Sequence, residues 1–428
     1  MQPRLISLLG LFVMVLLAWS MSSHRRSVSL RLVGGGMALQ LVFAVLVLKT
    51  APGQQLFLWL GEFFNYVLGY VDEGASFLFG VHPQEGDPAF PPPFMLLRSF
   101  AFGVLPTIVF FSSLMAILYH LGIMQRIVEL FARVMQRVLG TSGAESLSAA
   151  ANIFIGQTEA PLVIRPYIAS MTLSELNAVM VGGFATIAGG VLAAYVRMGV
   201  SAGHLITASV ISAPAALLIA KVMQPETGQP KTLGHVKMEV EKDTVNVIEA
   251  TAAGATQGLS LALNVGAMLL VFVALIALLN GVVGWFGGLF GFADAGAWTL
   301  QKGLGWVFSP LAWLMGIPWA EAQVAGQLLG IKTVINEFVA FAELGEILSG
   351  TPSVLTGNQP VELSERTVVI LTYALAGFAN FSSIGIQLGG IGGIAPERRS
   401  DLARLGLRAM IGGTLAAFMT ACVAGLLI

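Results

Sequence analysis

The sequence predicts an all-α membrane protein with eight transmembrane helices, two opposed re-entrant hairpins in an inverted repeat, and interfacial helices. Three observations predict it: the composition, the number of apolar stretches long enough to span a bilayer, and two further stretches interrupted by polar residues. Apolar residues make up 56% of the 428 residues and charged residues only 11%, against about 25% charged residues in soluble domains. A chain of this size cannot bury so much apolar surface in one water-soluble globule, so most of it must face lipid.

Eight apolar stretches are close to the roughly 20 residues that a membrane-spanning helix needs. They lie at residues 4–22, 33–51, 98–121, 174–198, 204–223, 247–280, 364–393 and 402–427. Three amphipathic segments between them are typical of helices that lie along the membrane surface. These are residues 56–71, 124–139 and 298–313.

The positive charges predict the orientation of the chain. Arg4 and the apolar stretch after it resemble a signal peptide. The basic residues Arg25, Arg26 and Arg31 that follow favour instead a retained first helix running from outside to inside. In this topology most of the 22 Lys and Arg residues fall in inside loops, as the positive-inside rule expects. Because the number of spans is even, both termini lie outside, in the periplasm.

Two apolar segments are broken in the middle, and they are the main indication of the class of protein. Residues 142–170 are interrupted at 156–161, and residues 319–348 at 332–337. Arms of about 12 to 14 residues give roughly 20 Å of helix, too short for a hydrocarbon core of about 30 Å. A re-entrant hairpin resolves this, and the similar stretches GFAT and GFAN follow the two hairpins in the same order. This arrangement indicates an inverted-repeat transporter.

The polar breaks hold the first candidates for a binding site. Gln157, Thr158 and Glu159 stand at the first break, and Glu337 stands at the second. Pro161 suits the first turn of a helix, so the first tip presents unpaired backbone N–H groups. A carboxylate at membrane depth is costly and by default marks a site that faces a cavity.

Each candidate also has a structural alternative. Glu159 could cap its helix or pair with Arg165, and Lys332 could form a salt bridge with Glu337. Asn380 could merely hydrogen-bond between helices, a common use of small polar residues in membranes. For the two carboxylates, a role in a binding site is favoured over a structural role. For Asn380 the two roles are about equally favoured.

The chemistry of the candidates limits the ligand. They offer two carboxylates, amides and hydroxyls, and no arginine cluster, which suits a neutral solute with hydroxyl and ring N–H donors and disfavours phosphates. Thr186, flanked by glycine pairs, marks a place where a helix could unwind and offer carbonyls to a cation. The net charge of −1 excludes nucleic acid as a partner, and five scattered histidines and the single Cys422 suggest neither a metal enzyme nor an intrachain disulfide.

Four stretches resemble the signature motifs of the concentrative nucleoside transporter family. They are NIFIGQTEAPLVIRP at 152–166, GGFATIAGGV at 182–191, TVINEFVAF at 333–341 and GFANFSSI at 377–384. The resemblance covers nearly the whole chain and suggests a bacterial member in the inner membrane. It implies a homotrimer whose substrate is a nucleoside and whose coupling ion is sodium.

The resemblance also implies roles for individual residues. Contacts to the nucleobase fall to Gln157, Thr158, Glu159 and Val191. Contacts to the ribose fall to Glu337, Asn380 and Ser383, with Phe378 packing on the nucleoside. Sodium would be held by Asn152, Thr186 and the carbonyls of Ile155 and Ile187.

The same resemblance implies a division of the chain into a scaffold and a mobile transport domain. The scaffold would comprise residues 1–140 and 246–318. The transport domain would comprise residues 141–223 and 319–428, each holding one hairpin and two spans, and residues 224–245 would form a cytoplasmic loop.

The expected activity is sodium-driven nucleoside import by an elevator-like movement of the transport domain, and not enzymatic catalysis. One alternative is proton coupling through Glu159 and Glu337, since buried carboxylates can carry protons. Two others come from different classes: a membrane-embedded enzyme with paired carboxylates, which lacks an acidic metal-binding cluster here, and a channel, which two charged hairpin tips suit less well than an occluding carrier.

Overall fold

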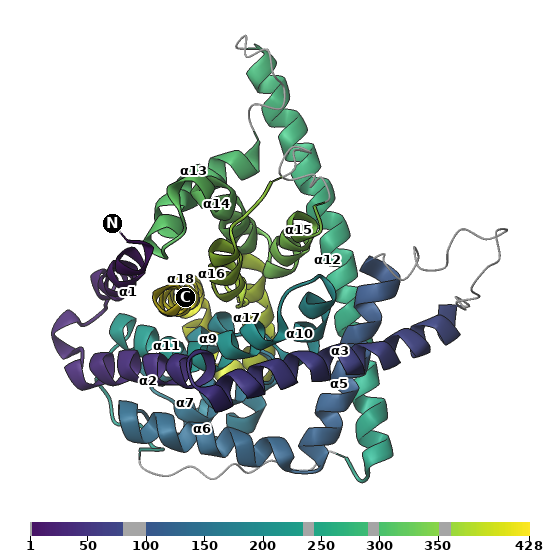
Figure 1. Ribbon diagram of the computed structural model, residues 1–428. Coiled ribbons are helices and arrows are strands. Elements are labelled where there is room, and N and C mark those ends of the chain that lie inside the picture. Colours follow the sequence, from purple (N-terminus) through teal and green to yellow (C-terminus); the bar gives the residue numbers. More distant parts are fainter. Residues whose placement is uncertain (1, 80–99, 234–243, 290–298, 351–360) are drawn as a thin grey trace.

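The structure is a computed structural model and describes residues 2–79, 100–233, 244–289, 299–350 and 361–428. Every regular element in these ranges is helical (Figure 1). Seven helical segments there are long and apolar enough to cross a membrane, so the prediction of an all-α membrane protein is confirmed. They comprise α1 (Pro3–Ser20), α2 (Leu30–Leu48), α5 (Leu105–His120), α9 (Leu173–Ala185) with α10 (Gly189–Arg197), α11 (Ala202–Met223), α12 (Val247–Leu289) and α18 (Arg399–Leu427).

The remaining predicted span, 364–393, is divided into α16 (Glu365–Leu375) and α17 (Phe381–Ile394). Its break contains the GFAN stretch, just as the GFAT stretch ends α9. The two breaks contact each other, because the Phe378 N–H donates to the Thr186 carbonyl at 3.3 Å. Gly377 permits this contact, since a Cβ there would lie 2.9 Å from the Phe184 carbonyl oxygen.

The three segments predicted to be interfacial are helical, within longer or equal elements. Residues 56–71 lie in α3 (Ala51–Phe79), 124–139 in α6 (Ile123–Leu139), and most of 298–313 in α13 (Leu300–Leu314). Trp298, the expected start of the third, lies outside the described residues. In Figure 1, α3 and α6 run across the direction of α12, as surface helices do relative to a span.

The two broken segments fold differently from each other. The second forms α14 (Trp319–Val334) and α15 (Glu337–Leu348), two helical arms as predicted. The first begins with α7 (Gly143–Ala151), but its second arm is a 3₁₀ helix (Ala160–Ile164) and a single turn, α8 (Arg165–Ile168). The prolines that begin each of these short pieces lack the N–H that a continuous α-helix would need there.

Two capping boxes fix where α7 and α9 begin. Ser142 accepts from the Glu145 N–H while the Glu145 carboxylate accepts from the Ser142 N–H, and Thr172 and Glu175 repeat the arrangement. The two boxes are joined, because the Ser142 hydroxyl donates to Glu175 Oε1 at 2.6 Å. Each box satisfies N–H groups that a helix start leaves unpaired.

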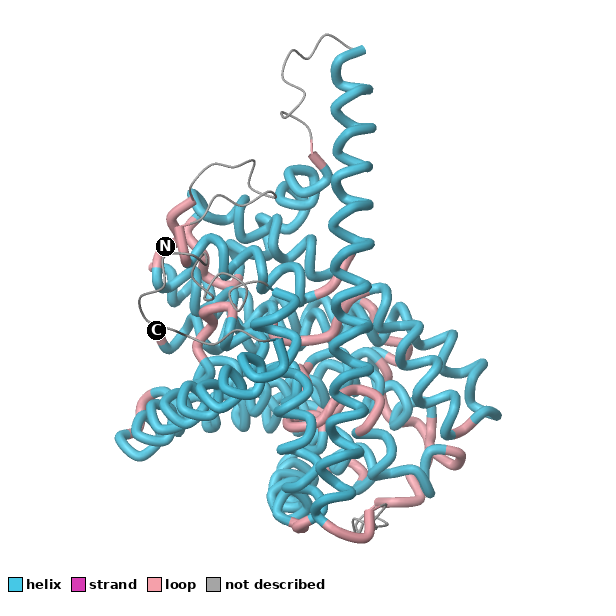
Figure 2. The backbone as a smooth tube through the Cα atoms, turned by 90° about the vertical axis from the view of Figure 1, so that its right-hand side faces the viewer, coloured by secondary structure: helices cyan, strands magenta, loops and turns pink. Residues whose placement is uncertain are grey.

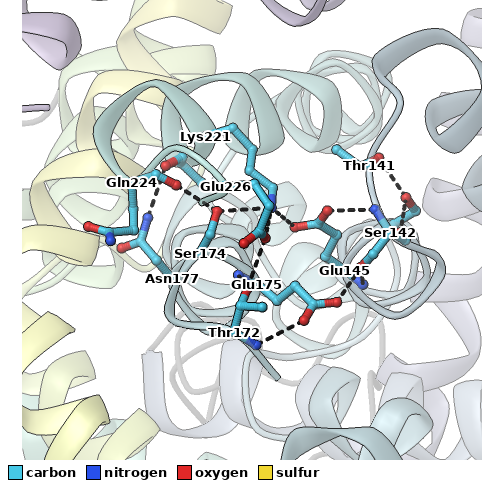
Figure 3. Close-up of polar contacts among 12 residues, drawn as sticks. Thr141, Ser142, Glu145, Thr172, Ser174, Glu175, Asn177, Lys221, Gln224 and Glu226 are labelled. Atoms are coloured by element: carbon cyan, nitrogen blue, oxygen red, sulfur yellow. Dashed lines mark hydrogen bonds and ion pairs between the residues drawn. The ribbon is translucent and has the colours of Figure 1, made fainter. Parts of the chain in front are cut away.

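A buried lysine connects these helix starts to the end of α11 (Figure 3). Lys221 Nζ lies 2.7 Å from Glu145 Oε2, 3.2 Å from Glu226 Oε2 and 2.9 Å from Ser174 Oγ. Lys221 and Glu145 are both buried. Removing one partner of a buried pair leaves an uncompensated charge, which is strongly destabilising. The cluster therefore holds the first hairpin rigidly against α9 and α11.

The connection after α11 is packed rather than simply solvated. Glu226 accepts from the Thr172 hydroxyl at 2.8 Å, and Thr232 is buried. Burial alone would raise the pKa of Glu226, but the Lys221 ammonium and hydrogen bonds lower it below its ordinary value. Residues 234–243 of the predicted loop lie outside the described residues.

The long helix α12 stands apart from the rest of the fold. Figures 1 and 2 show it extending well beyond the other helices at one end. Only 11% of its most apolar window is buried, against 78% for the corresponding window in α18. Most of α12 is therefore available to lipid or to another copy of the chain, whereas α18 lies inside the fold.

Candidate functional site

Both hairpins meet at the amino-terminal turn of α17. Asn380 caps this helix, its Oδ1 accepting from the Ser383 N–H at 2.9 Å. Its Nδ2 donates to Glu337 Oε2 of the second hairpin at 3.0 Å. Ser383 Oγ accepts from Gln157 Nε2 of the first hairpin at 3.2 Å. Four predicted site residues are thus joined through one helix terminus, whose partial positive charge favours an anionic or oxygen-rich neighbour.

Glu337 is buried and forms no ion pair within the described part of the chain. It is 3% exposed, and its Oε1 accepts from the Tyr195 hydroxyl at 3.2 Å. Lys332 is fully buried too, but it donates to the Ala374 carbonyl at 2.6 Å. No ion pair joins Lys332 to Glu337 in the described part of the chain. The salt-bridge alternative for Glu337 is therefore wrong, and its carboxylate is held by neutral donors.

Glu159 does not take part in the hydrogen-bonded chain around α17 and instead contacts α12. It is half-buried, and its Oε1 accepts from Gln257 Nε2 of α12 at 3.2 Å. Its side chain does not cap the 3₁₀ helix that follows, and among the described ion pairs none joins it to the exposed Arg165. Both structural alternatives for Glu159 are contradicted. The carboxylate folds over Gly156, where any side chain would displace it.

The other predicted contacts lie on the same elements. Thr158 packs against α17, because a Cβ at Gly390 would lie 2.7 Å from Thr158 Cγ2. Val191 is 2% exposed in the first turn of α10. Phe378 is half-buried in the break before α17. The apolar side chains expected against a substrate thus adjoin the polar ones.

Two buried residues that touch this network carry no strong local signal in the sequence. Gln387 Nε2 donates to Gln157 Oε1 at 3.0 Å and to the Met180 carbonyl at 3.1 Å. Tyr195, fully buried, donates to Glu337. The clue for Gln387 was its polar side chain one turn after Ser383 in an otherwise apolar helix, since i and i+4 share a face. Tyr195 resembles any core aromatic in an apolar span.

The residues predicted to bind a cation are also brought together. The Gly189 N–H donates to the Phe154 carbonyl at 2.9 Å, which places the break after α9 against the break in the first hairpin. Asn152 Nδ2 lies 3.3 Å from where a Cβ of Gly182 would be, and Thr186 Oγ1 donates to the Gly182 carbonyl at 2.9 Å. Asn152 and Thr186 therefore flank the same backbone position.

Three oxygens in this group have no hydrogen-bond partner in the described part of the chain, and the fourth, the Thr186 hydroxyl, donates to the Gly182 carbonyl. Asn152 is 1% exposed, and its Oδ1 is buried without a hydrogen bond from any described residue. None of the hydrogen bonds between described residues ends on the carbonyls of Ile155 or Ile187. Buried acceptors are normally paired, so an unpaired set of neutral oxygens fits a bound cation. In secondary transporters, backbone carbonyls freed where helices unwind coordinate sodium ions.

Comparison with known families decides the relationship. Three family models match: "Na+ dependent nucleoside transporter N-terminus" over residues 9–82, "Nucleoside recognition" over residues 101–202, and "Na+ dependent nucleoside transporter C-terminus" over residues 204–425. The chain belongs to the concentrative nucleoside transporter family. The predicted resemblance is confirmed, and the relatives of this family member are transporters rather than enzymes.

Individual relatives agree with this membership. An uncharacterized transporter of Haemophilus influenzae is 49% identical and covers 99% of this chain and 98% of its own. The sodium/nucleoside cotransporter 1 of Mus musculus is 42% identical over 99% of this chain, which spans 64% of that protein. Among solved structures, CNTnw in an inward-facing substrate-bound state has a TM-score of 0.88 and 46% identity, covering 100% and 98% of the two chains. A variant of CNTnw in an outward-facing state matches equally well.

In this family member, Tyr195→Phe is expected to weaken nucleoside binding roughly tenfold. The substitution removes the donor to Glu337 and keeps the ring, which stacks 4.4 Å from Phe341. A hydrogen bond to a charged group contributes about 1.5–3 kcal/mol, and about 1.4 kcal/mol is a tenfold change in affinity. The measurement is competition by unlabelled uridine for uptake of labelled uridine.

The matched control is Tyr373→Phe. Tyr373 is equally buried, but its hydroxyl pairs with His204 at 3.2 Å, away from Glu337. Equal loss of affinity in both variants would show that the effect comes from deleting any buried hydroxyl and not from the bond to Glu337.

Proposed function

We propose that the protein is a secondary active symporter that imports nucleosides across the bacterial inner membrane, driven by a sodium gradient. The observation that carries the proposal is the chain of hydrogen bonds that runs from Gln157 through Ser383 and Asn380 to Glu337. It joins both hairpins through neutral donors and a carboxylate, the groups that recognise hydroxyls and ring N–H groups without attracting an anion.

The proposed contacts follow this division. Gln157, Thr158, Glu159 and Val191 contact the nucleobase. Glu337, Asn380 and Ser383 contact the ribose, and the ring of Phe378 packs on the nucleoside. Substrate hydroxyls would donate to the remaining lone pairs of the Glu337 oxygens, beside the hydrogen bonds from Tyr195 and Asn380.

Sodium is proposed to bind the unpaired oxygens of Asn152, Ile155 and Ile187 together with a lone pair of the Thr186 hydroxyl, whose proton is donated to the Gly182 carbonyl. The set is neutral and made of oxygen alone, which suits sodium. The proton alternative remains the second candidate, because Glu337 is a buried carboxylate that forms no ion pair among the described residues and such a group can carry a proton.

The proposed movement is an elevator-like displacement of residues 141–223 and 319–428 past a scaffold of residues 1–140 and 246–318. Polar contacts between the two parts include Glu159 with Gln257 and a bidentate pair of Arg197 with Asp72, at 2.9 and 2.6 Å. Contacts of this kind can exchange as one part moves. The relatives captured in inward-facing and outward-facing states support alternating access.

A homotrimer with both termini in the periplasm completes the proposal. Arg4 Nε donates to the Ile428 carbonyl at 2.8 Å, which supports placing the two termini on one side of the membrane. The largely exposed α12 supplies surface for contacts between copies.

Nucleoside monophosphates are expected not to compete with nucleosides. A phosphate bound at this site would lie near the buried carboxylate of Glu337, with no arginine in the hydrogen-bonded network to neutralise it, and a buried unpaired charge is costly. The experiment is uptake of labelled uridine by proteoliposomes in the presence of excess uridine, cytidine, adenosine or their monophosphates. Inhibition by uridine monophosphate equal to that by uridine would reject the proposed site.

A further inference from the structure

The helix α12 carries a polar stripe that the proposed function does not use. Its members are Thr256, Gln257, Ser260 and Asn264, all exposed. At about 100° per residue they fall within an arc of about 100°, so they share one face over two turns. α12 is the most apolar of the candidate spans in the described chain, and polar groups in such a helix are costly unless they have a partner or face a cavity.

This stripe is not the surface by which α12 packs on α5. That contact uses the small residues Gly254 and Gly258, whose Cβ positions would lie 2.7 Å from the Cα atoms of Ser113 and Val109. Such close approach of two helices needs small residues and leaves no room for polar side chains. The stripe therefore needs another explanation.

The stripe faces the tip of the first hairpin. Glu159 and the four polar residues line one shallow, largely open depression of about 610 Å³. Gln257 Nε2 donates to Glu159 Oε1 at 3.2 Å across it. An amide of the scaffold thus bonds to Glu159, the carboxylate that contacts the nucleobase in the proposed function.

We propose that the polar stripe of α12 is the scaffold side of the nucleobase site and that Gln257 helps determine which nucleobases are accepted. This inference rests on the proposed function. Glu159 supplies an acceptor and Gln257 an adjacent donor, and Asn264 offers a second amide on the same face. The empty carrier satisfies Glu159 with Gln257, and the incoming base takes up both groups.

The pair explains tolerance for several bases. Uracil presents an N3–H donor beside a carbonyl acceptor, and the other bases also present a donor beside an acceptor on their pairing edges. Replacing the donor of Gln257 by an acceptor would therefore penalise uracil. Guanine would be penalised less, because its N1–H and exocyclic amino group offer two adjacent donors.

The test measures inhibition constants for uridine and guanosine in proteoliposomes holding Gln257→Leu, Gln257→Glu or the wild type. Gln257→Leu is expected to raise the uridine constant about threefold to tenfold, the worth of one hydrogen bond. Gln257→Glu is expected to raise it similarly and to shift the uridine-to-guanosine ratio at least threefold toward guanosine. The control, Thr251→Val, removes a hydroxyl that bonds only within α12, to the Val247 carbonyl, and should change neither constant.

Light scattering gives the mass of the assembly formed by each purified variant. It therefore distinguishes a role of Gln257 in nucleobase binding from a role in contacts between copies of the chain. Uridine constants within twofold of wild type for both Gln257 variants would overturn the inference, and so would an unchanged nucleoside ratio accompanied by a loss of assembly mass. If the wild type itself takes up no nucleoside, the proposed function fails and this inference fails with it. If the wild type transports and the variants are unaltered, only the inference fails.

Discussion

Glu337→Gln is expected to reduce nucleoside uptake by about tenfold to a hundredfold while leaving the protein folded. The wild-type carboxylate accepts from both Tyr195 and Asn380. A glutamine offers one oxygen and one NH₂ group, so one of these donors would face another donor. Loss of a hydrogen bond to a charged group costs about 1.5–3 kcal/mol, and an unpaired buried donor adds to that cost.

Asn380 cannot relieve the conflict by turning its amide over. Its Oδ1 already accepts from the Ser383 N–H at 2.9 Å and from the Ser382 hydroxyl at 2.7 Å. A flip would point NH₂ at these donors and remove the cap of α17, a loss of about 1 kcal/mol. Uptake is measured with labelled uridine, and Glu129→Gln, which breaks an exposed pair with Arg133, controls for loss of charge alone. Near-normal uptake by Glu337→Gln would show that Glu337 is not part of the binding site.

Asn152→Ala is expected to raise the sodium concentration for half-maximal uptake by about tenfold or more, with the order of preferred nucleosides unchanged. The substitution deletes an unpaired buried oxygen that the proposal assigns to the ion. The measurement is uridine uptake against sodium concentration at constant ionic strength. The loss should appear in the sodium dependence because Asn152 does not belong to the hydrogen-bonded chain around Glu337.

Asn177→Ala is a closely matched control for this effect. Asn177 is also buried with an unpaired Oδ1, and its Nδ2 donates to the Ala220 carbonyl at 3.1 Å, as that of Asn152 donates to Ser148. Its substitution should lower thermal stability and leave the sodium dependence alone. The same sodium requirement in wild type and Asn152→Ala would show that sodium does not bind at Asn152.

The sequence predicted the features that depend on composition and local breaks. Apolar length identified seven of the eight predicted spans, and the polar tips made Gln157, Glu159 and Glu337 candidates for the site because charge at membrane depth has few structural uses. Tyr195 and Gln387 escaped, since each is one side chain in an apolar helix and gains its meaning only from a partner far along the chain. The capping boxes at Ser142 and Thr172 were readable locally, but their connection through Lys221 depends on tertiary packing.

One error and one rejected alternative have specific physical causes. The second arm of the first hairpin was expected to be an α-helix, but Pro161 and Pro166 limit it to a 3₁₀ helix and one α turn. Lys332 was considered as the partner of Glu337 because the two are close in sequence. Its position near the end of α14 points the ammonium at the Ala374 carbonyl instead. Sequence separation along a broken helix is thus a poor guide to which charges meet.

Sodium-driven accumulation of a nucleoside tests the central claim most directly. Proteoliposomes holding the purified wild type would receive an imposed inward sodium gradient at equal pH on both sides, with choline replacing sodium in the control. We expect labelled uridine to accumulate above its external concentration with sodium and only to equilibrate slowly with choline. Full accumulation driven by a pH gradient in the absence of sodium would contradict this and make Glu159 and Glu337 the coupling groups.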